Sequence, residues 1–378
     1  MSSRLFLAGQ RNEKMKIAIA SVLKPADDVR AFEKMAMTLV AAGHEVYLIG
    51  MPATTQTTPD NTHFLELVPF HRLDWRRLLA PFRVLKKLRK VKPELLIVNT
   101  HELLLVSVAN RILFGVKICY DIQENYYRNI RWTQSFPPWM RRPLAMWVRL
   151  KERLLTPFFH RVIFAEKCYL DEIRFLSKRA VVIENKAVLP KDFIRRQETG
   201  KIILAFTGTL GVSTGVFEAI ELADQLYEKR ADIELHILGF CAVPDVLADI
   251  MNRCSGKSYI KLAAGRMQVG HSRIMDLISR AHFGIISYPP SRHTRNRIPT
   301  KLFEYMSARL PILLTDNPTW AAVTAPVSAA IAVDFRNPDV DAILADMGRK
   351  DFYTGPVSGF LWASEHQKLI DLVSTLSE

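Results

Sequence analysis

Short apolar runs alternate with segments of helical periodicity from Met15 onward. Residues 15–23 (M-K-I-A-I-A-S-V-L) have the composition of a buried strand. Residues 30–42 then place Phe32, Met35 and Leu39 at helical spacing, and residues 44–50 form a second apolar run. Parallel strands need a crossover connection, usually a helix, so this pattern predicts a strand–helix–strand unit of a parallel sheet.

The same alternation continues in two series that are separated by a polar stretch. The first series adds strands at 94–99, 117–121, 161–165 and 180–184 and a helix at 103–113. The second adds strands at 202–207, 233–238, 259–262, 283–287 and 311–315, with helices at 216–227, 246–254, 272–280 and 301–308. An amphipathic helix at 364–376 ends the chain. We therefore predict an α/β fold of two tandem Rossmann-like, doubly wound domains.

This division gives expected boundaries. Residues 15–190 form the first domain, 200–360 the second and 361–378 a terminal helical segment, while 185–200 is the linker and 1–14 an extension. A length of 378 residues suits two domains. With 49% hydrophobic and 24% charged residues the chain is globular in composition.

Compartment signals are few. No apolar run is long enough to span a bilayer, and the apolar patch near the N-terminus is too short for a signal-peptide core. The four cysteines show no C-x-x-C spacing and no histidine cluster beside them, which indicates free thiols in a reducing compartment. We therefore expect a cytoplasmic protein.

The charge is unevenly placed. The formal net charge is +14, but residues 1–200 carry +15 and the remainder −1. The excess lies in two windows, 72–92 and 128–161, which combine Lys and Arg with Trp, Phe and Leu at helical spacing. Pro81 and Pro143 suit the first positions of the two predicted helices, the second of which would run to Leu155. Such segments are typical of helices that bind an anionic membrane surface. The alternative is that they only cover the sheet, with their basic residues in water.

Two segments of the second half have the chemistry of a phosphate site. Residues 206–215 (F-T-G-T-L-G-V-S-T-G) lie between a predicted strand and helix, where glycines let a phosphate approach the backbone. Residues 291–304 (S-R-H-T-R-N-R-I-P-T-K-L-F-E) bring several cations to a helix start near Thr300. An ordinary turn and a solvated basic loop are the alternatives.

The helix segment P-x-K-L-x-E-Y-M-x-A-x-x-P-I at 299–312, together with G-T-L at 208–210, carries a family resemblance. Weaker support comes from G-H-E-V at 43–46, Y-D-I-Q-E at 120–124, I-E-N at 183–185 and I-I-S-Y-P at 285–289. From residue 15 onward the chain resembles retaining GT-B-fold nucleotide-sugar glycosyltransferases of the glycogen-synthase-like group, of the type that builds bacterial polysaccharides and lipid-linked glycans.

The resemblance implies a donor site. Glu304 matches the glutamate that holds the nucleotide ribose, and the amides of Thr300, Lys301 and Leu302 with the loop of Gly208, Thr209 and Gly211 would hold the diphosphate. The linker would be the interdomain hinge, and the terminal helix would cross back to the first domain. No cofactor is implied; a UDP- or GDP-sugar is the substrate.

The sequence departs from the family pattern at three positions. Asn296 replaces the first glutamate of E-x7-E, Thr214 replaces a lysine before the glycine of the first loop, and Gln123 replaces a histidine. The cations that compensate are expected among Arg266, Arg292, Arg295, Arg297 and Lys301.

The acceptor side is expected at strand ends of the first half. The catalytic candidates are Glu124, Asp121 and His101, because a carboxylate or imidazole there can orient or deprotonate an attacking hydroxyl. Asp27, Arg30 and Gln123 are further acceptor-side candidates. Loop-capping roles are the alternative for all of them.

Residues 339–341 form the sole D-x-D pattern, which fits a helix start better than a metal site, so we expect no metal. The sequence thus predicts a metal-independent hexosyltransferase that moves a sugar, with retention, to a hydroxyl of a lipid-linked or polysaccharide acceptor at the inner membrane face. A nucleotide-sugar epimerase of the same fold, or a non-catalytic basic homologue that binds membranes or nucleic acid, are the alternatives. No nucleic-acid motif is present, so we do not expect that partner.

Overall fold

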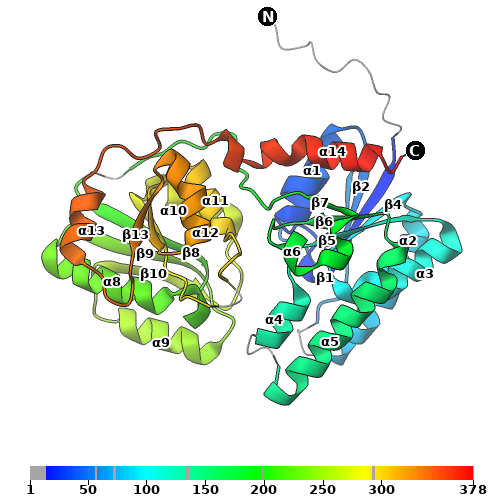
Figure 1. Cartoon of the computed structure of the whole chain (residues 1–378), viewed down its shortest axis with the longest axis horizontal. Coiled ribbons are helices and arrows are strands. Elements are labelled where there is room, and N and C mark those ends of the chain that lie inside the picture. Colours follow the sequence, from blue (N-terminus) through cyan, green and yellow to red (C-terminus); the bar gives the residue numbers. More distant parts are fainter. Residues whose placement is uncertain are drawn as a thin grey trace, which may run out of the picture. The chain divides into compact units, whose positions relative to one another are not determined.

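The computed structural model describes residues 14–55, 58–70, 74–132, 136–197, 199–291 and 294–377. The chain divides into two compact units (Figure 1). The first unit comprises Met1–Asn185 and Glu365–Glu378, and the second comprises Lys186–Ser364. The predicted extension at 1–14 lies, except for Lys14, outside the described residues.

The first unit is built on a parallel sheet of seven strands. Their order is β3 (Thr62–Glu66), β2 (Glu45–Met51), β1 (Lys16–Pro25), β4 (Leu95–Val98), β5 (Lys117–Ile122), β6 (Arg161–Phe164) and β7 (Ala180–Val182). Its helices are α1 (Met37–Ala41), α2 (Ala80–Val91), α3 (Leu104–Phe114), α4 (Tyr126–Trp132), α5 (Pro138–Leu155), α6 (Tyr169–Glu172), α7 (Arg174–Ser177) and α14 (His366–Ser374). A π-helical segment, Arg30–Ala36, leads into α1.

The central strands of this sheet are buried. Ala18 and Ala20 of β1 belong to the same core cluster as Val84 of α2 and Leu104 of α3. The small side chains of β1 leave room for these two helices. Strand β4 pairs in parallel with both β1 and β5, so the carboxyl ends of these three strands lie side by side at one edge of the sheet.

The second unit holds a parallel sheet of six strands. Their order is β10 (Ile260–Gly265), β9 (Ile233–Phe240), β8 (Ile202–Thr209), β11 (Phe283–Ile286), β12 (Ile312–Thr315) and β13 (Ala330–Val333). Its helices are α8 (Val216–Lys229), α9 (Pro244–Cys254), α10 (His271–Arg280), α11 (Thr300–Ser307), α12 (Pro318–Thr324) and α13 (Val340–Met347).

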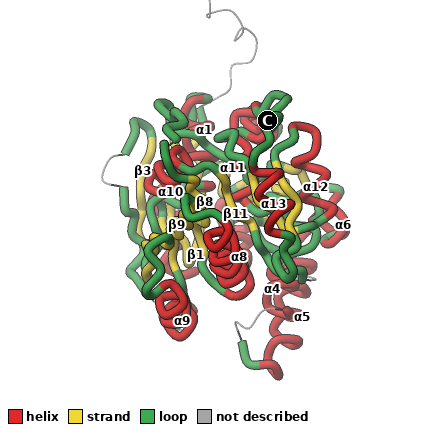
Figure 2. The backbone as a smooth tube through the Cα atoms, turned by 90° about the vertical axis from the view of Figure 1, so that its left-hand side faces the viewer, coloured by secondary structure: helices red, strands yellow, loops and turns green. Residues whose placement is uncertain are grey.

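Strand β8 shows how both faces of this sheet are covered. Leu204 and Phe206 pack in a cluster with α8 and α9, whereas Ile203 and Ala205 pack with α10 and α11. Successive side chains of a strand point to opposite faces, so a run without polar interruption requires helices on both. Figure 2 shows these strands in yellow with helices in red around them.

The predicted fold class, two Rossmann-like α/β domains, is confirmed by the two sheets. Strands β3 and β13 were not predicted, because each is short and lies at a sheet edge where burial is incomplete. Helix α5 was predicted to open at Pro143, but it begins at Pro138 and contains Pro143.

The chain changes unit at two points. Asn185 is the last residue of the first unit before the second, and Glu365 begins the return. Residues 185–200 were predicted to be a linker. From Lys186 onward they belong to the second unit, where Ala187 forms a bridge to Leu361 and the Arg196 amide donates to the Ser279 carbonyl at 2.7 Å. This stretch is therefore anchored on the second unit. Helix α14 packs on α1 of the first unit (Figure 1), as expected of a terminal helix that crosses back.

Candidate functional site

The glycine loop of the second unit follows the carboxyl end of β8. Gly208 and Gly215 have φ of +88° and +77°, a region that favours glycine. A Cβ at Gly215 would lie 1.9 Å from the Ser287 carbonyl oxygen, and the Ser287 hydroxyl donates to the Gly215 carbonyl at 2.6 Å. The Thr214 hydroxyl lies within hydrogen-bond distance of carbonyl oxygens of its own loop (Thr209, 3.0 Å). Hydrogen bonds within the loop therefore stabilise its conformation, and the loop packs against the end of β11.

Lys301, in the first turn of α11, reaches this loop. Its Cε would lie 3.2 Å from a Cβ placed on Gly208, so its stem packs against that glycine. Its Nζ lies 4.2 Å from the centre of the Phe206 ring and 5.5 Å from that of Tyr288. The side chain is buried, at 7% exposure, and Nζ has no hydrogen-bond partner among the described residues.

This environment perturbs the titration of Lys301. Burial lowers its pKa to about 7, while the Glu304 carboxylate acts in the opposite direction. A buried ammonium without a hydrogen-bond acceptor is unfavourable. An anionic ligand in the glycine loop would supply the missing acceptor.

Glu304 lies one turn further along α11. Its Oε1 is 3.9 Å from Nε2 of His271, the first residue of α10, and both side chains are about 15% exposed. Burial raises the pKa of Tyr288, which follows β11, to about 12, so its hydroxyl remains a hydrogen-bond donor. Lys301, Glu304 and Tyr288 therefore converge with the glycine loop at the carboxyl edge of the second sheet.

The other predicted donor residues are less closely placed. The Leu302 amide donates to the Pro299 carbonyl, so it is already used within the helix start. Arg266 and Arg295 are exposed, and Arg297 accepts a hydrogen bond at its carbonyl from the Trp320 indole. Arg292 lies outside the described residues.

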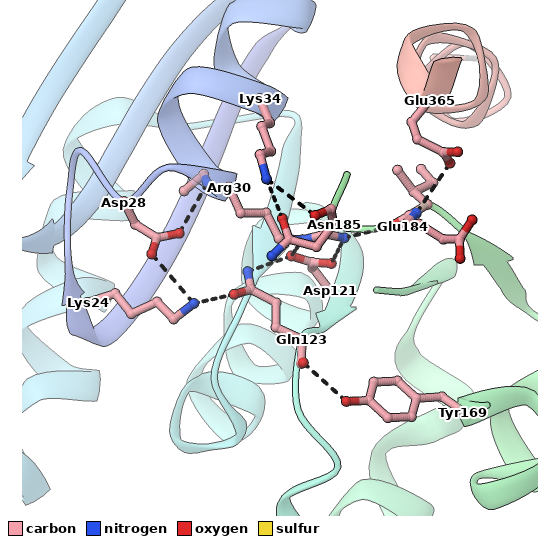
Figure 3. A network of polar contacts seen from close by, with 12 residues as sticks. Lys24, Asp28, Arg30, Lys34, Asp121, Gln123, Tyr169, Glu184, Asn185 and Glu365 are labelled. Atoms are coloured by element: carbon pink, nitrogen blue, oxygen red, sulfur yellow. Dashed lines mark hydrogen bonds and ion pairs between the residues drawn. The ribbon is translucent and has the colours of Figure 1, made fainter. Parts of the chain in front are cut away.

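In the first unit a polar network joins the ends of β1 and β5 (Figure 3). Arg30 and Asp121 form a buried ion pair with two hydrogen bonds, at 3.0 and 2.7 Å, and Arg30 also donates to the Ile183 carbonyl. Gln123 donates to Asp121 at 2.7 Å and accepts from Lys24. Asp121 is fully buried with both carboxylate oxygens bonded, which indicates a structural role for it and for Arg30.

The network continues to both points where the chain leaves and re-enters this unit. Lys34 donates to the Asn185 side chain at 2.8 Å. The Glu184 amide donates to Glu365, a fully buried residue, at 3.2 Å. Figure 3 shows Glu365 pointing from its helix toward Glu184. The sequence pattern did not single out Lys24, Lys34 or Glu365, since each acts through residues far away in the chain.

The remaining acceptor-side candidates lie at the same sheet edge. His101, after β4, contacts Lys151 through Nδ1 at 3.0 Å, and burial lowers its pKa to about 4. Glu124 is exposed and accepts from Asn129 at 2.8 Å. Burial acts to raise the pKa of Asp27, but hydrogen bonds from Thr54 and Thr55 lower it overall, so that carboxylate is a loop cap.

Both basic windows form helices that expose apolar side chains. In the first window, residues 72 and 73 lie outside the described residues, and so do residues 133–135 of the second. The exposed large apolar residues of the described part are Trp75, Leu78, Leu79 and Phe82 in the first, and Trp132, Trp139, Met146, Trp147, Leu150 and Leu154 in the second. Helix α3 contacts both α2 and α5. In the described part of the chain no helix has the length and hydropathy to cross a bilayer.

The D-x-D pattern is a helix start. The Asp339 carboxylate caps α13 by accepting from the Ala342 amide, and Asp341 pairs with Lys229. Within the described ranges, no group of three or more His, Cys, Asp or Glu side chains is arranged to hold a metal ion. Three residues beside this loop were not among the predicted site residues: Ser287, Tyr288 and His271. The first two lie in the I-I-S-Y-P segment at 285–289, directly after β11.

No family model matches the sequence, and no curated protein matches it. Solved structures do match. Sucrose-phosphate synthase from Thermosynechococcus elongatus superposes with a TM-score of 0.71 at 13% identity, covering 96% of this chain and 99% of that one. The catalytic domain of starch synthase IV from Arabidopsis thaliana, bound to ADP and acarbose, gives 0.66 at 11% identity and covers 97% and 100%.

A third similar structure is the HepE protein of Anabaena in complex with UDP and glucose, with a TM-score of 0.66 at 11% identity and coverage of 96% and 100%. These neighbours are glycosyltransferases of the GT-B fold. The chain therefore has the GT-B fold, and the predicted architecture of two Rossmann-like domains with a returning terminal helix is confirmed.

Proposed function

We propose that this protein is a metal-independent glycosyltransferase that moves a hexose from a UDP- or GDP-sugar, with retention, to a hydroxyl of a lipid-linked or polysaccharide acceptor. One observation carries the proposal most of all: the buried Nζ of Lys301 has no hydrogen-bond partner in the described part of the chain and packs at Gly208. The GT-B neighbour in complex with UDP and glucose supports a nucleotide sugar as the ligand.

The proposed role of Lys301 is to stabilise the leaving group of the sugar donor. When the glycosidic bond of the donor breaks, negative charge develops on the leaving diphosphate. A preorganised cation in a site that excludes water stabilises that charge more than solvent does. Lys301 supplies the cation and the start of α11 a partial positive charge. In this proposal Lys301 replaces the family lysine that is absent at Thr214, whose hydroxyl bonds its own loop.

Glu304 would accept hydrogen bonds from the ribose hydroxyls, as the resemblance implies, with His271 beside it. Tyr288 provides a buried ring and a hydroxyl donor near the same point. Arg295 and Arg297 belong to the loop that precedes α11 and would meet the outer face of the diphosphate.

On the acceptor side, Glu124 is the candidate that contacts the attacking hydroxyl, because its carboxylate is exposed. His101 is neutral at pH 7 and would orient that hydroxyl through Nε2, since Nδ1 already faces Lys151. Asp121 and Arg30 hold Gln123 and the loop beneath it.

The proposed location is the inner face of the membrane, with the protein cytoplasmic and peripheral. The basic helices in residues 74–92 and 138–155 expose Trp and Leu side chains, a composition that binds anionic lipid. A lipid-linked acceptor would be met at that surface.

The experiment measures donor binding and turnover separately. Isothermal titration with UDP, GDP and their hexose conjugates on the wild-type chain should identify one binding nucleotide. Lys301→Met should weaken it by about 30- to 100-fold, because a charge-assisted contact is lost. Lys350→Met, at an exposed lysine, is the matched control and should bind as the wild type does. Equal binding by both variants would remove the site assignment.

Turnover tests the finer points. With a membrane extract as acceptor, the bound donor should release nucleoside diphosphate in the presence of EDTA, and the product linkage should keep the donor's anomeric configuration by NMR. A changed sugar without added acceptor would instead indicate an epimerase.

A further inference from the structure

A cavity in the first unit lies at the opposite edge of its sheet from the polar network. It has a volume of about 630 Å³ and lies where β1, β4 and β5 begin and where α2 and α3 end, beside the last residues of the chain. Figure 1 shows the C-terminus and the start of β1 together at this edge. This volume is within the range of small-molecule sites.

The lining of the cavity is strongly cationic. Among the described residues, the lining has four cations, Lys14, Arg89, Lys92 and Lys117, and one carboxylate, that of Glu94. The Glu94 Oε2 already accepts a hydrogen bond from the Lys16 amide at 2.8 Å. Cations near helix C-termini stabilise the helices, which accounts for Arg89 and Lys92 at the end of α2. Helix C-termini do not account for Lys14 and Lys117, which lie at the starts of strands. The surplus of positive charge therefore points to an anionic ligand.

A buried polar group in the same wall also lacks a partner. Asn110 of α3 lines the cavity and is 2% exposed, yet its Nδ2 has no hydrogen-bond partner among the described residues. A buried amide donor left unpaired costs about 1–3 kcal/mol. An oxygen of a ligand in the cavity would accept from it, and phosphate oxygens are good acceptors.

The end of α3, next to the cavity in the chain, is apolar and exposed. Ile112, Leu113 and Phe114, the last residues of α3, are 67%, 60% and 56% exposed, and Phe114 also lines the cavity. The Arg89 guanidinium lies 5.7 Å from the Phe114 ring. Three consecutive apolar residues that are all exposed form a projecting helix end. An anion site bordered by such an end matches a ligand with an anionic head and apolar chains.

We propose that this cavity binds the headgroup of an anionic phospholipid while residues 112–114 insert among the acyl chains. The site would orient the first unit on the membrane through one specific lipid contact, in addition to the diffuse attraction of the basic helices. The inference takes from the proposed function only the membrane as its setting, and it requires no donor chemistry.

The test uses the full-length protein and short-chain dihexanoyl-phosphatidylglycerol below its micelle concentration, with binding followed by isothermal titration. We expect saturable binding that the double variant Arg89→Gln/Lys92→Gln reduces at least tenfold. The control, Lys261→Gln/Lys350→Gln, removes the same charge from exposed positions of the second unit, outside the cavity and the basic helices, and should keep the affinity within about twofold. Asn110→Leu leaves the charge unchanged and should reduce the affinity about tenfold.

Vesicles of phosphatidylglycerol and phosphatidylcholine test the exposed end of α3. Ile112→Ser/Leu113→Ser should lose most of its vesicle binding and keep the short-chain lipid affinity. The proposal is overturned if the control double variant falls as far as the cavity variant, or if glycerol 3-phosphate binds as tightly as the short-chain lipid, which would indicate a soluble phosphorylated ligand. Nucleotide affinity of the same variants should stay at the wild-type value, so a failure here is distinguishable from a failure of the proposed function.

Discussion

Replacing Lys301 by methionine should weaken binding of the proposed nucleotide donor and raise the free energy of unfolding. Methionine keeps the length of the stem against Gly208 and the Phe206 ring but removes the ammonium. Most substitutions of a binding residue leave stability unchanged or lower it. A gain in stability combined with a loss of binding is therefore a specific signature of a cation that is held in place for a ligand.

The magnitude follows from the pKa. Burial lowers the pKa of Lys301 from its ordinary value of 10.5 to about 7. Keeping it protonated in the folded chain thus costs about 4–5 kcal/mol relative to the unfolded chain at 1.36 kcal/mol per pKa unit. Structural relaxation of the folded chain lowers this free-energy cost. We therefore expect Lys301→Met to raise the free energy of unfolding by at least about 1 kcal/mol at pH 7. In a unit of this size that raises Tm by about 2–4 °C or more.

The gain should depend on pH with a definite sign. The folded pKa lies below the unfolded value, so the unfolded chain binds more protons between pH 7 and 10.5. Wild-type stability from this group therefore rises with pH in that window. The advantage of Lys301→Met should be constant below pH 7 and shrink above it, whereas Lys350→Met should show no such trend.

Calorimetry at pH 6, 7, 8 and 9 measures the stability, and titration with the binding nucleotide measures the affinity over the same range. Wild-type affinity should decline above pH 7, since the diphosphate prefers the protonated lysine, and that slope should vanish in Lys301→Met. A variant that is less stable than the wild type at pH 7, or that retains the slope, would refute the assignment of Lys301 as an anion ligand.

Three further predictions concern the surroundings of both sites. Gly215→Ala places a methyl group on the Ser287 carbonyl at a positive φ and should lose at least about 2 kcal/mol of unfolding free energy in chemical denaturation, while Gly256→Ala, at a positive φ in open space, should lose less. Arg30→Met should lose about 3–5 kcal/mol because it leaves Asp121 charged and buried; adding Asp121→Leu should recover part of that loss, and no recovery would argue against the ion pair as the cause. Glu304→Gln should remove the preference for a nucleotide with both ribose hydroxyls over its 2′,3′-dideoxy analogue; a variant that still discriminates by the wild-type factor would exclude the ribose contact.

Much of the fold followed from local pattern. The strands around residues 15–23 and 202–207 are buried on both faces, so their apolar runs have no polar interruption and are recognisable alone. Edge strands β3 and β13 were missed because partial burial leaves a short, mixed pattern. The start of α5 was misplaced, since a proline near a helix start is compatible with more than one first residue.

The candidate site was predicted in its parts but not in its contacts. The glycine loop, Lys301 and Glu304 were recognisable because each follows a strand or opens a helix in the second series. The sequence pattern could not show that Asp121 is paired with Arg30, because that ion pair joins residues 91 positions apart. Asp121 was a catalytic candidate in the sequence, and in the fold it is buried and paired with Arg30.

By itself, the sequence determined the two α/β halves, the glycine loop and the asymmetry of charge, since periodicity, turn chemistry and composition are local properties. Tertiary structure decided which polar groups are satisfied and which are left without a partner. Whether Lys301 or Asn110 has an acceptor depends on distant segments that pack around it. Burial removes water as the alternative partner, and this makes an unpaired group in the folded chain informative about a ligand.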